Sequence, residues 1–171
     1  DGARKPQDVG RDYALSFDRR SGAAPLLTVY GGKLTTYRRL AEDVLKRLSR
    51  FFPRSDRWTA NAPLPGGDFL FDGEPALIAR TQRQWPFLTD AHARRLVRAY
   101  GTRVESVMAG AGRLDDLGAP FGADLTAAEV RYLMSREWAQ TADDVLWRRS
   151  KLGLRFSDAQ RAKLEHFMAT R

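Results

Sequence analysis

Apolar and polar residues alternate in the first predicted element of the chain. Tyr13, Leu15 and Phe17 are separated by polar or small residues, which is the two-residue period of a half-buried strand. Residues 18–25 are rich in turn-forming residues, and residues 26–30 form an apolar run typical of a more buried strand. We expect these two strands to pair as a β-hairpin.

A helix is predicted directly after Gly31 and Gly32, ending near Arg50. Apolar residues recur along it at intervals of three and four, and charged residues occupy the opposite face. Phe52 precedes Pro53, and a residue before proline avoids the helical conformation. The helix is therefore expected to end here.

A connection rich in proline and glycine follows at residues 54–75, with three of each. This composition predicts a domain boundary, with one domain at residues 1–55 and a second at residues 60–171. Large apolar side chains in the connection indicate that it packs against something: Trp58, Leu64, Phe69 and Phe71.

From Pro75 onward the pattern predicts only helices. Residues 114–125 are predicted to be a loop, and Glu129, three residues after Thr126, is predicted to complete a capping box. Hydroxyl side chains suited to capping precede four helical patterns: Thr89, Thr126, Thr141 and Ser157. The expected fold is a mainly α fragment of the α+β class, with a short hairpin, one long helix and an all-helical C-terminal domain.

We expect several side chains in this second region to have structural rather than catalytic roles. We expect Trp138 to be buried beside Val130 and Leu133, whereas His92 and His166 are expected to be solvated. Asp115 and Asp116 are expected to be caps, and Arg148 and Arg149 are expected either to tie helix ends through Asp143 or Asp144 or to face the partner domain.

Composition excludes several kinds of chemistry. The chain has no cysteine and two histidines, which argues against a disulfide framework, a thiolate site or a histidine-rich metal site, and we predict no metal. No apolar run approaches the ~20 residues of a membrane span. The first residues lack both an initiating methionine and a signal-peptide pattern, so we expect a piece of a longer protein.

The formal net charge is +8, from 24 arginines, 5 lysines and 21 acidic residues. Such a balance suits nucleic acid, an acidic membrane surface or a phosphorylated ligand. The basic residues are spread along the chain among acidic ones, which favours an arginine-rich solvated surface. A basic helical module that docks on an acidic membrane or protein remains one alternative, and a nucleic-acid-binding domain another.

The stretch at residues 26–45 places a glycine pair between a strand and a helix. It is not a phosphate-binding P-loop, because GGKLTT lacks that spacing, and no GxGxxG occurs in the chain. A helix N-terminus carries roughly +0.5 of an elementary charge, and glycines allow close approach of a ligand. With Lys33, Thr35 and Thr36, this tip could stabilise an electron-rich carbonyl or a reduced ring. Spacing alone favours a plain glycine turn with an exposed lysine.

A resemblance to a known protein family favours the ligand-binding interpretation over a plain glycine turn. The run VYGGKLTTYRRLAEDVL, preceded by GRDY and PLLTVY, is similar to the C-terminal region of FAD-dependent glycerol-3-phosphate dehydrogenases, which are aerobic and membrane-associated. APLPGGDF at 62–69, EVRYLMSREWAQTADDVLWRRSKLGL at 129–154 and a final helix opening FSDAQ also resemble that family, in its order. The resemblance covers the whole chain.

The resemblance implies roles for particular residues. Gly31, Gly32, Lys33, Leu34 and Thr35 correspond to the family's flavin-contacting loop, with Lys33 as an active-site lysine near substrate and flavin. Arg11, in GRDY, resembles an arginine that binds the substrate phosphate. The family usually has serine or threonine before that arginine, where this chain has Gly10.

The resemblance also implies a cofactor and partners. The full protein would bind FAD in an N-terminal domain that this chain lacks, oxidise sn-glycerol 3-phosphate to dihydroxyacetone phosphate, and pass electrons to quinone. It would be cytoplasmic and peripheral on the inner face of the cell membrane, with no nucleic-acid partner and with a homodimer as one assembly. The general base would lie outside this chain, and the fragment alone is expected to be inactive.

Overall fold

A computed structural model describes residues 12–53 and 56–170 of the chain. The chain divides into two compact units between Ala62 and Pro63, called unit 1 and unit 2 below. The expected fold class, a mainly α fragment with a small hairpin, is confirmed.

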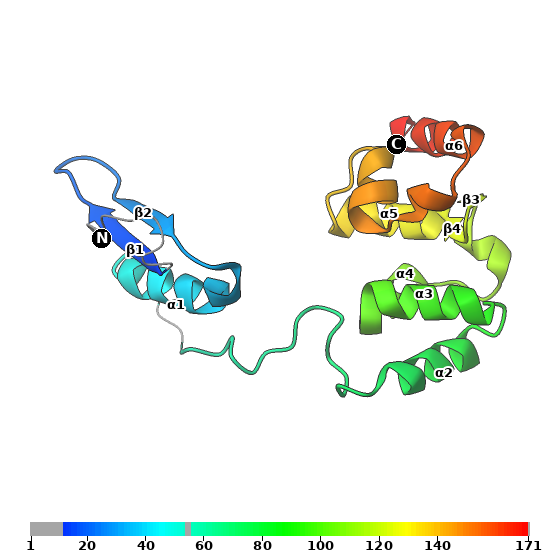
Figure 1. Ribbon diagram of the computed structural model, residues 1–171, viewed down its shortest axis with the longest axis horizontal. Coiled ribbons are helices and arrows are strands. Elements are labelled where there is room, and N and C mark those ends of the chain that lie inside the picture. Colours follow the sequence, from blue (N-terminus) through cyan, green and yellow to red (C-terminus); the bar gives the residue numbers. More distant parts are fainter. Residues whose placement is uncertain (1–11, 54–55, 171) are drawn as a thin grey trace, which may run out of the picture. The chain divides into compact units, whose positions relative to one another are not determined.

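Unit 1 is a β-hairpin with one helix beside it (Figure 1). Strand β1 (Tyr13–Asp18) pairs antiparallel with β2 (Leu26–Gly31), as predicted. The predicted helix starts as a 3-10 turn at Leu34–Thr36 and continues as α1 (Tyr37–Leu48). The rings of Phe17 and Phe51, whose centroids are 6.1 Å apart, join the hairpin to the end of this helix.

Unit 1 lacks a closed core. None of its described residues is buried, and Leu26, in the strand predicted to be buried, is 61% exposed. The prediction of a buried second strand is therefore wrong for this chain. Its exposed large apolar residues are Leu26, Val29, Tyr30, Leu34, Tyr37, Leu45, Phe51, Phe52 and Trp58.

Unit 2 is mainly helical and contains all the buried apolar residues of the described chain. Its α-helices are α2 (Glu74–Gln84), α3 (Asp90–Tyr100), α4 (Val104–Val107), α5 (Ala127–Arg136) and α6 (Asp158–Ala169) (Figure 1). Shorter turns connect them, namely a π-helical turn at Asp144–Arg149 and 3-10 turns at Gly101–Arg103, Leu114–Leu117 and Leu152–Arg155.

The prediction that this region holds only helices is wrong in one place. Strand β3 (Pro120–Gly122) pairs antiparallel with β4 (Leu125–Thr126) inside the segment predicted to be a loop. Ala123 and Asp124 adopt positive φ angles of 46° and 64° between the strands. Left-handed residues of this kind form tight turns, which lets so short a hairpin close.

Of the four predicted helix caps, those at Thr89, Thr141 and Ser157 are confirmed and the one at Thr126 is wrong. The Thr89 hydroxyl accepts from the amide of His92, and Ser157 and Gln160 form a capping box. Thr126 makes no side-chain cap, and Glu129 does not reach back to it. Glu129 is instead 1% exposed and binds a partner on another helix.

A buried network joins α3 to α5 through Glu129. The two Nη atoms of Arg95 lie 2.7 and 2.8 Å from its carboxylate oxygens, and the Tyr100 hydroxyl donates to Oε1 at 2.7 Å. Burial and the Glu129 charge raise the pKa of Tyr100. Burial opposes the Arg95 charge, but the hydrogen bonds and charge of Glu129 outweigh it, so the Arg95 pKa is raised.

Two further side chains differ from prediction. His92 is buried at 5% exposure rather than solvated, and burial and the nearby Arg95 lower its pKa. Trp138 is 83% exposed rather than buried, because it follows the end of α5 with a φ of 54° and leaves the helical path. His166 is exposed, as predicted.

The helix-tying interpretation is confirmed for Asp116 and Arg148. Asp116 accepts from the amides of Gly112 and Arg113, and Arg148 pairs with Asp144 at 3.0 Å. The predicted aspartate partner of Arg149 is wrong, because its guanidinium donates instead to the Glu137 carbonyl at 2.9 Å.

Two absences hold for the described residues. Within 12–53 and 56–170, no helix combines the length and apolar character needed to cross a bilayer. The same residues contain no group of three or more histidine and carboxylate side chains arranged to hold a metal ion.

Candidate functional site

The glycine pair ends β2 and turns the chain toward α1. Gly31 and Gly32 have φ angles of 69° and 106°, which side chains other than glycine rarely adopt. A Cβ atom on Gly31 would also lie 3.2 Å from the backbone oxygen of Asp12. Two glycines are therefore required for this turn, whatever its function.

The helix tip beyond the glycines presents free backbone amides. The Lys33 carbonyl accepts from the Thr36 amide at 3.0 Å and from its hydroxyl at 2.9 Å. In the described structure, no acceptor is recorded for the amides of Leu34 and Thr35, which belong to the unpaired first turn of a helix. Both residues are exposed, Leu34 by 89%, so no side chain of the described residues covers the tip.

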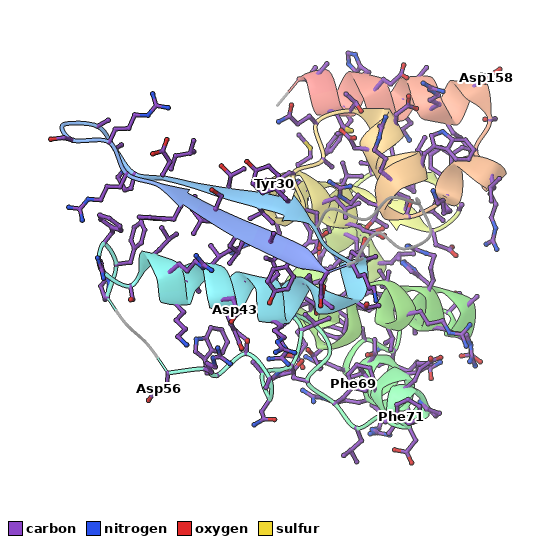
Figure 2. All side chains as sticks on the ribbon, turned by 60° about the vertical axis from the view of Figure 1, so that its left-hand side comes forward. Tyr30, Asp43, Asp56, Phe69, Phe71 and Asp158 are labelled. Atoms are coloured by element: carbon purple, nitrogen blue, oxygen red, sulfur yellow. The ribbon has the colours of Figure 1, made fainter. Side chains whose placement is uncertain are left out.

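Lys33, Tyr30 and Tyr37 lie beside this tip along the chain. The Lys33 side chain is exposed and has no ion-pair partner among the described residues. Tyr30, at the end of β2 (Figure 2), is 59% exposed, and Tyr37 is 57% exposed. The loop therefore combines donors and a cation with apolar ring faces. The tyrosines were not predicted as site residues, although they flank the glycine pair in sequence.

Polar contacts fix α1 against its neighbours. The Tyr13 hydroxyl donates to Asp43, a contact that lowers the pKa of Asp43 and raises that of Tyr13. The Thr59 hydroxyl donates to Glu42, which, together with Arg38, lowers the pKa of Glu42. Both carboxylates stay ionised at neutral pH, so they hold the strand and residues 56–59 to one face of the helix.

The predicted cofactor residues fit a flat, electron-rich ring. Gly31, Gly32, Lys33, Leu34 and Thr35 lie together in one exposed loop. Unpaired amides at a helix N-terminus favour negative charge on an approaching oxygen. An isoalloxazine carbonyl of FAD is an acceptor of this kind. Arg11, the predicted substrate-binding residue, and Gly10 lie outside the described residues.

Comparison with known proteins matches residues 57–170 to the C-terminal domain of alpha-glycerophosphate oxidase. The aerobic glycerol-3-phosphate dehydrogenase of Escherichia coli K12 is 41% identical over 169 residues, which are 98% of this chain and 34% of that protein. The glycerol-3-phosphate dehydrogenase of Pseudomonas aeruginosa PAO1 is 46% identical over 169 residues, 98% of this chain and 33% of that protein.

A third relative has another name. The D-erythritol 1-phosphate dehydrogenase of Brucella abortus 2308 is 45% identical over 164 residues, 95% of this chain and 32% of that protein. The chain therefore spans about a third of the length of each of these relatives.

Proposed function

The chain belongs to the family of the C-terminal domain of alpha-glycerophosphate oxidase, and we propose that it is the C-terminal third of an FAD-dependent dehydrogenase of phosphorylated polyols. The substrate we propose is sn-glycerol 3-phosphate, oxidised at C2 to dihydroxyacetone phosphate. The observation that carries the proposal is the uncovered amide tip at Leu34 and Thr35 behind two glycines of positive φ.

The chain's own residues would bind and orient the flavin ring and the substrate. The amides of Leu34 and Thr35 donate to a ring carbonyl, and the helix N-terminus favours the negative charge that develops there. When bound, FAD would supply the acceptor for the hydride that leaves C2. The Lys33 ammonium lies on a mobile stem beside the ring site and would hold a substrate oxygen. Arg11 would bind the phosphate with its fork of donors.

The exposed apolar surface of unit 1 supports a larger assembly. Leu26, Val29 and Tyr30 are 61%, 42% and 59% exposed, although a strand of this composition is usually buried. We propose that the preceding part of the protein, which carries the dinucleotide-binding domain, covers these residues. The isolated chain should then neither hold FAD firmly nor turn over substrate.

D-erythritol 1-phosphate is a second candidate substrate. The relative named for that compound is 45% identical, against 41% and 46% for two relatives named for glycerol 3-phosphate. Both compounds present a phosphate and a neighbouring hydroxyl, so the same Arg11 and Lys33 roles apply. The full-length protein should be assayed with each, and the higher kcat/KM identifies the substrate.

Further features of the proposal come from the family resemblance. Electrons would leave through quinone, and the protein would lie peripherally on the inner face of the cell membrane. A homodimer is part of the same proposal. The basic balance of the chain, +8, suits an anionic lipid surface.

The Lys33→Ala variant of the full-length protein tests the site. Loss of a charge aimed at the reacting substrate should lower kcat/KM by about 10²–10³-fold, the range for removing one such donor. Lys46→Ala removes an exposed lysine from the last turn of the same helix and serves as control. Equal kinetics in wild type and Lys33→Ala would refute the role of Lys33.

Glycine variants test the ring contact separately. Gly32 has a φ of 106° that alanine rarely adopts, and an added Cβ would lie 3.5 Å from Tyr13 and 3.9 Å from Leu40, so Gly32→Ala should shift the loop backbone and lower the flavin content of the purified protein. Gly22→Ala is a matched control, because Gly22 also has positive φ, 78°, but lies in the hairpin turn with no atom within 4 Å of the added carbon. Full flavin retention in Gly32→Ala would argue against the loop as the contact.

A further inference from the structure

A basic groove lies within unit 2, between α3 and the turn at residues 149–155. Its volume is about 600 Å³. The turn belongs to the stretch RRSKLGLR, which the proposed flavin loop does not account for. The side chains that line the groove come from both elements and from the β3–β4 turn: Ala91, Arg94, Arg95, Arg98, Ala99, Asp124, Arg149, Ser150, Lys151, Leu152, Leu154 and Arg155.

Two of the six cations in the groove are neutralised. Arg95 pairs with Glu129 at 2.7 Å, and Arg98 pairs with Glu74 at 2.7 Å. No ion pair within the described residues involves the other four, Arg94, Arg149, Lys151 and Arg155. Asp124 is the single acidic residue that lines the groove. Like charges around one space repel one another, and an anion between them would relieve that repulsion.

The backbone holds the cations of the turn in place. Lys151 follows the π-helical turn with a left-handed φ of 61°, a conformation that disfavours a side-chain-bearing residue by roughly 1–2 kcal/mol. Its ammonium donates to the Trp147 carbonyl, and the Ser150 hydroxyl donates to the Val145 carbonyl at 2.6 Å. Gly153 packs so closely on Trp147 that an added Cβ would lie 2.5 Å from the indole ring. The backbone of the turn and the Lys151 ammonium are therefore pre-positioned.

We propose that the basic groove binds a small anion of the phosphate-ester class. Guanidinium groups match the geometry of phosphate oxygens, and here three of them surround one ammonium. The volume falls within the range of about 300–1,000 Å³ typical of small-molecule sites. Ala91, Ala99 and Leu152 supply apolar surface for a short carbon skeleton. A concave site of this size fits a small molecule better than a flat bilayer surface.

The groove lies wholly inside unit 2, which has its own core, so its occupancy can be measured on this chain without catalysis. Calorimetry and amide chemical shifts at low salt would follow titration with inorganic phosphate and with glycerol 3-phosphate, and with glycerol as a neutral control. We expect saturable binding of both phosphates, with the shifts centred on residues 91–99 and 149–155, and no response to glycerol. Glycerol 3-phosphate should bind more tightly than inorganic phosphate, because Ala91, Ala99 and Leu152 would contact its carbon skeleton.

Variants assign the binding to the groove. Arg94 and Arg155 are exposed and unpaired, so the double variant Arg94→Gln/Arg155→Gln should keep the helical circular dichroism and lose about tenfold or more in phosphate affinity. Arg83→Gln/Arg136→Gln removes the same charge from exposed, unpaired positions outside the groove and should change affinity less than about twofold.

Several outcomes would overturn the proposal. They are no saturable binding of either phosphate up to about 10 mM, an equal loss of affinity in the two double variants, or equal competition by chloride. Sedimentation with anionic vesicles without phosphate binding would assign the groove to a membrane surface instead.

Discussion

The buried pair of Arg95 and Glu129 gives the sharpest stability prediction. Replacing Arg95 with methionine keeps the length and the apolar stem of the side chain but removes two hydrogen bonds to Glu129, one to the Asp124 carbonyl, and the charge opposite Glu129. Glu129 is 1% exposed, so its carboxylate would retain the Tyr100 hydroxyl at 2.7 Å as its recorded partner. Breaking a buried ion pair on one side typically lowers the free energy of unfolding by about 3–5 kcal/mol.

Such a loss is large beside the ~5–15 kcal/mol that stabilises a typical domain. Urea unfolding followed by near-UV circular dichroism would report on unit 2, which holds the buried aromatic residues Trp85, Tyr100 and Phe121. Arg94→Met makes the same substitution at an exposed, unpaired position of α3 and should change stability by less than about 0.5 kcal/mol.

A triple variant distinguishes the cost of burying an unpaired charge from the cost of lost packing. Arg95→Met/Tyr100→Phe/Glu129→Leu removes all the polar groups of the network together, and an apolar replacement of a buried pair is often nearly neutral. It should therefore recover most of the loss. A decrease of less than about 1 kcal/mol in Arg95→Met alone would contradict the reasoning, because the carboxylate would then be solvated or neutralised at little cost.

Two further predictions concern acid stability and a close backbone contact. The amides of Gln140 and Thr141 and the Thr141 hydroxyl lower the pKa of Asp144 to about 2, so its contribution to stability is complete above the unfolded value of about 3.9 and is lost as the pH falls through about 2. Thermal melts between pH 5 and pH 2 should show a weaker pH dependence in Asp144→Asn, and an unchanged slope would contradict the assignment. A Cβ on Gly101 would lie 1.8 Å from the Gly66 oxygen, so Gly101→Ala should destabilise unit 2 by at least about 1 kcal/mol more than Gly110→Ala, whose added carbon meets no atom within 4 Å. Equal midpoints in urea for the two glycine variants would argue against a tight contact between these loops.

Local signals predicted the elements that depend on near neighbours in sequence. The alternation at Tyr13, Leu15 and Phe17 identified β1, and the hydroxyl side chains of Thr89 and Ser157 marked true helix starts. The glycine pair also predicted a sharp turn, and both residues have the positive φ that such a turn requires.

Residues with distant partners were predicted less well. The spacing from Thr126 to Glu129 fits a capping box, but Arg95, 34 positions away, offers the carboxylate a charged partner, and the ion pair forms instead. Trp138 continues the apolar period of α5, yet the helix ends at Arg136, two residues earlier, and the side chain turns outward. Helical periodicity does not reveal where a helix stops.

The flavin-contacting loop and the basic groove also differ in how far the sequence could predict them. The flavin-contacting loop is contiguous, so sequence and resemblance could propose it whole. The basic groove joins α3 to a turn more than 50 residues later, and only the fold brings Arg94 near Arg155. Charge in the stretch RRSKLGLR was the available signal, and it was interpreted as helix-tying.

The absence of a buried side chain among the residues of unit 1 that the structure describes affects how mutations in this unit would be interpreted. A survey of substitutions scored by the folding of this chain alone would count polar replacements at Leu26, Val29 and Tyr30 as harmless, since these side chains already face water. The same replacements in a polypeptide that covers the hairpin would remove apolar burial worth roughly 1.5–3 kcal/mol at a residue such as leucine. The effects of substitutions on stability that are measured with this chain alone would therefore differ from their effects in the larger protein for residues of the hairpin. For residues of unit 2, the two sets of effects would agree.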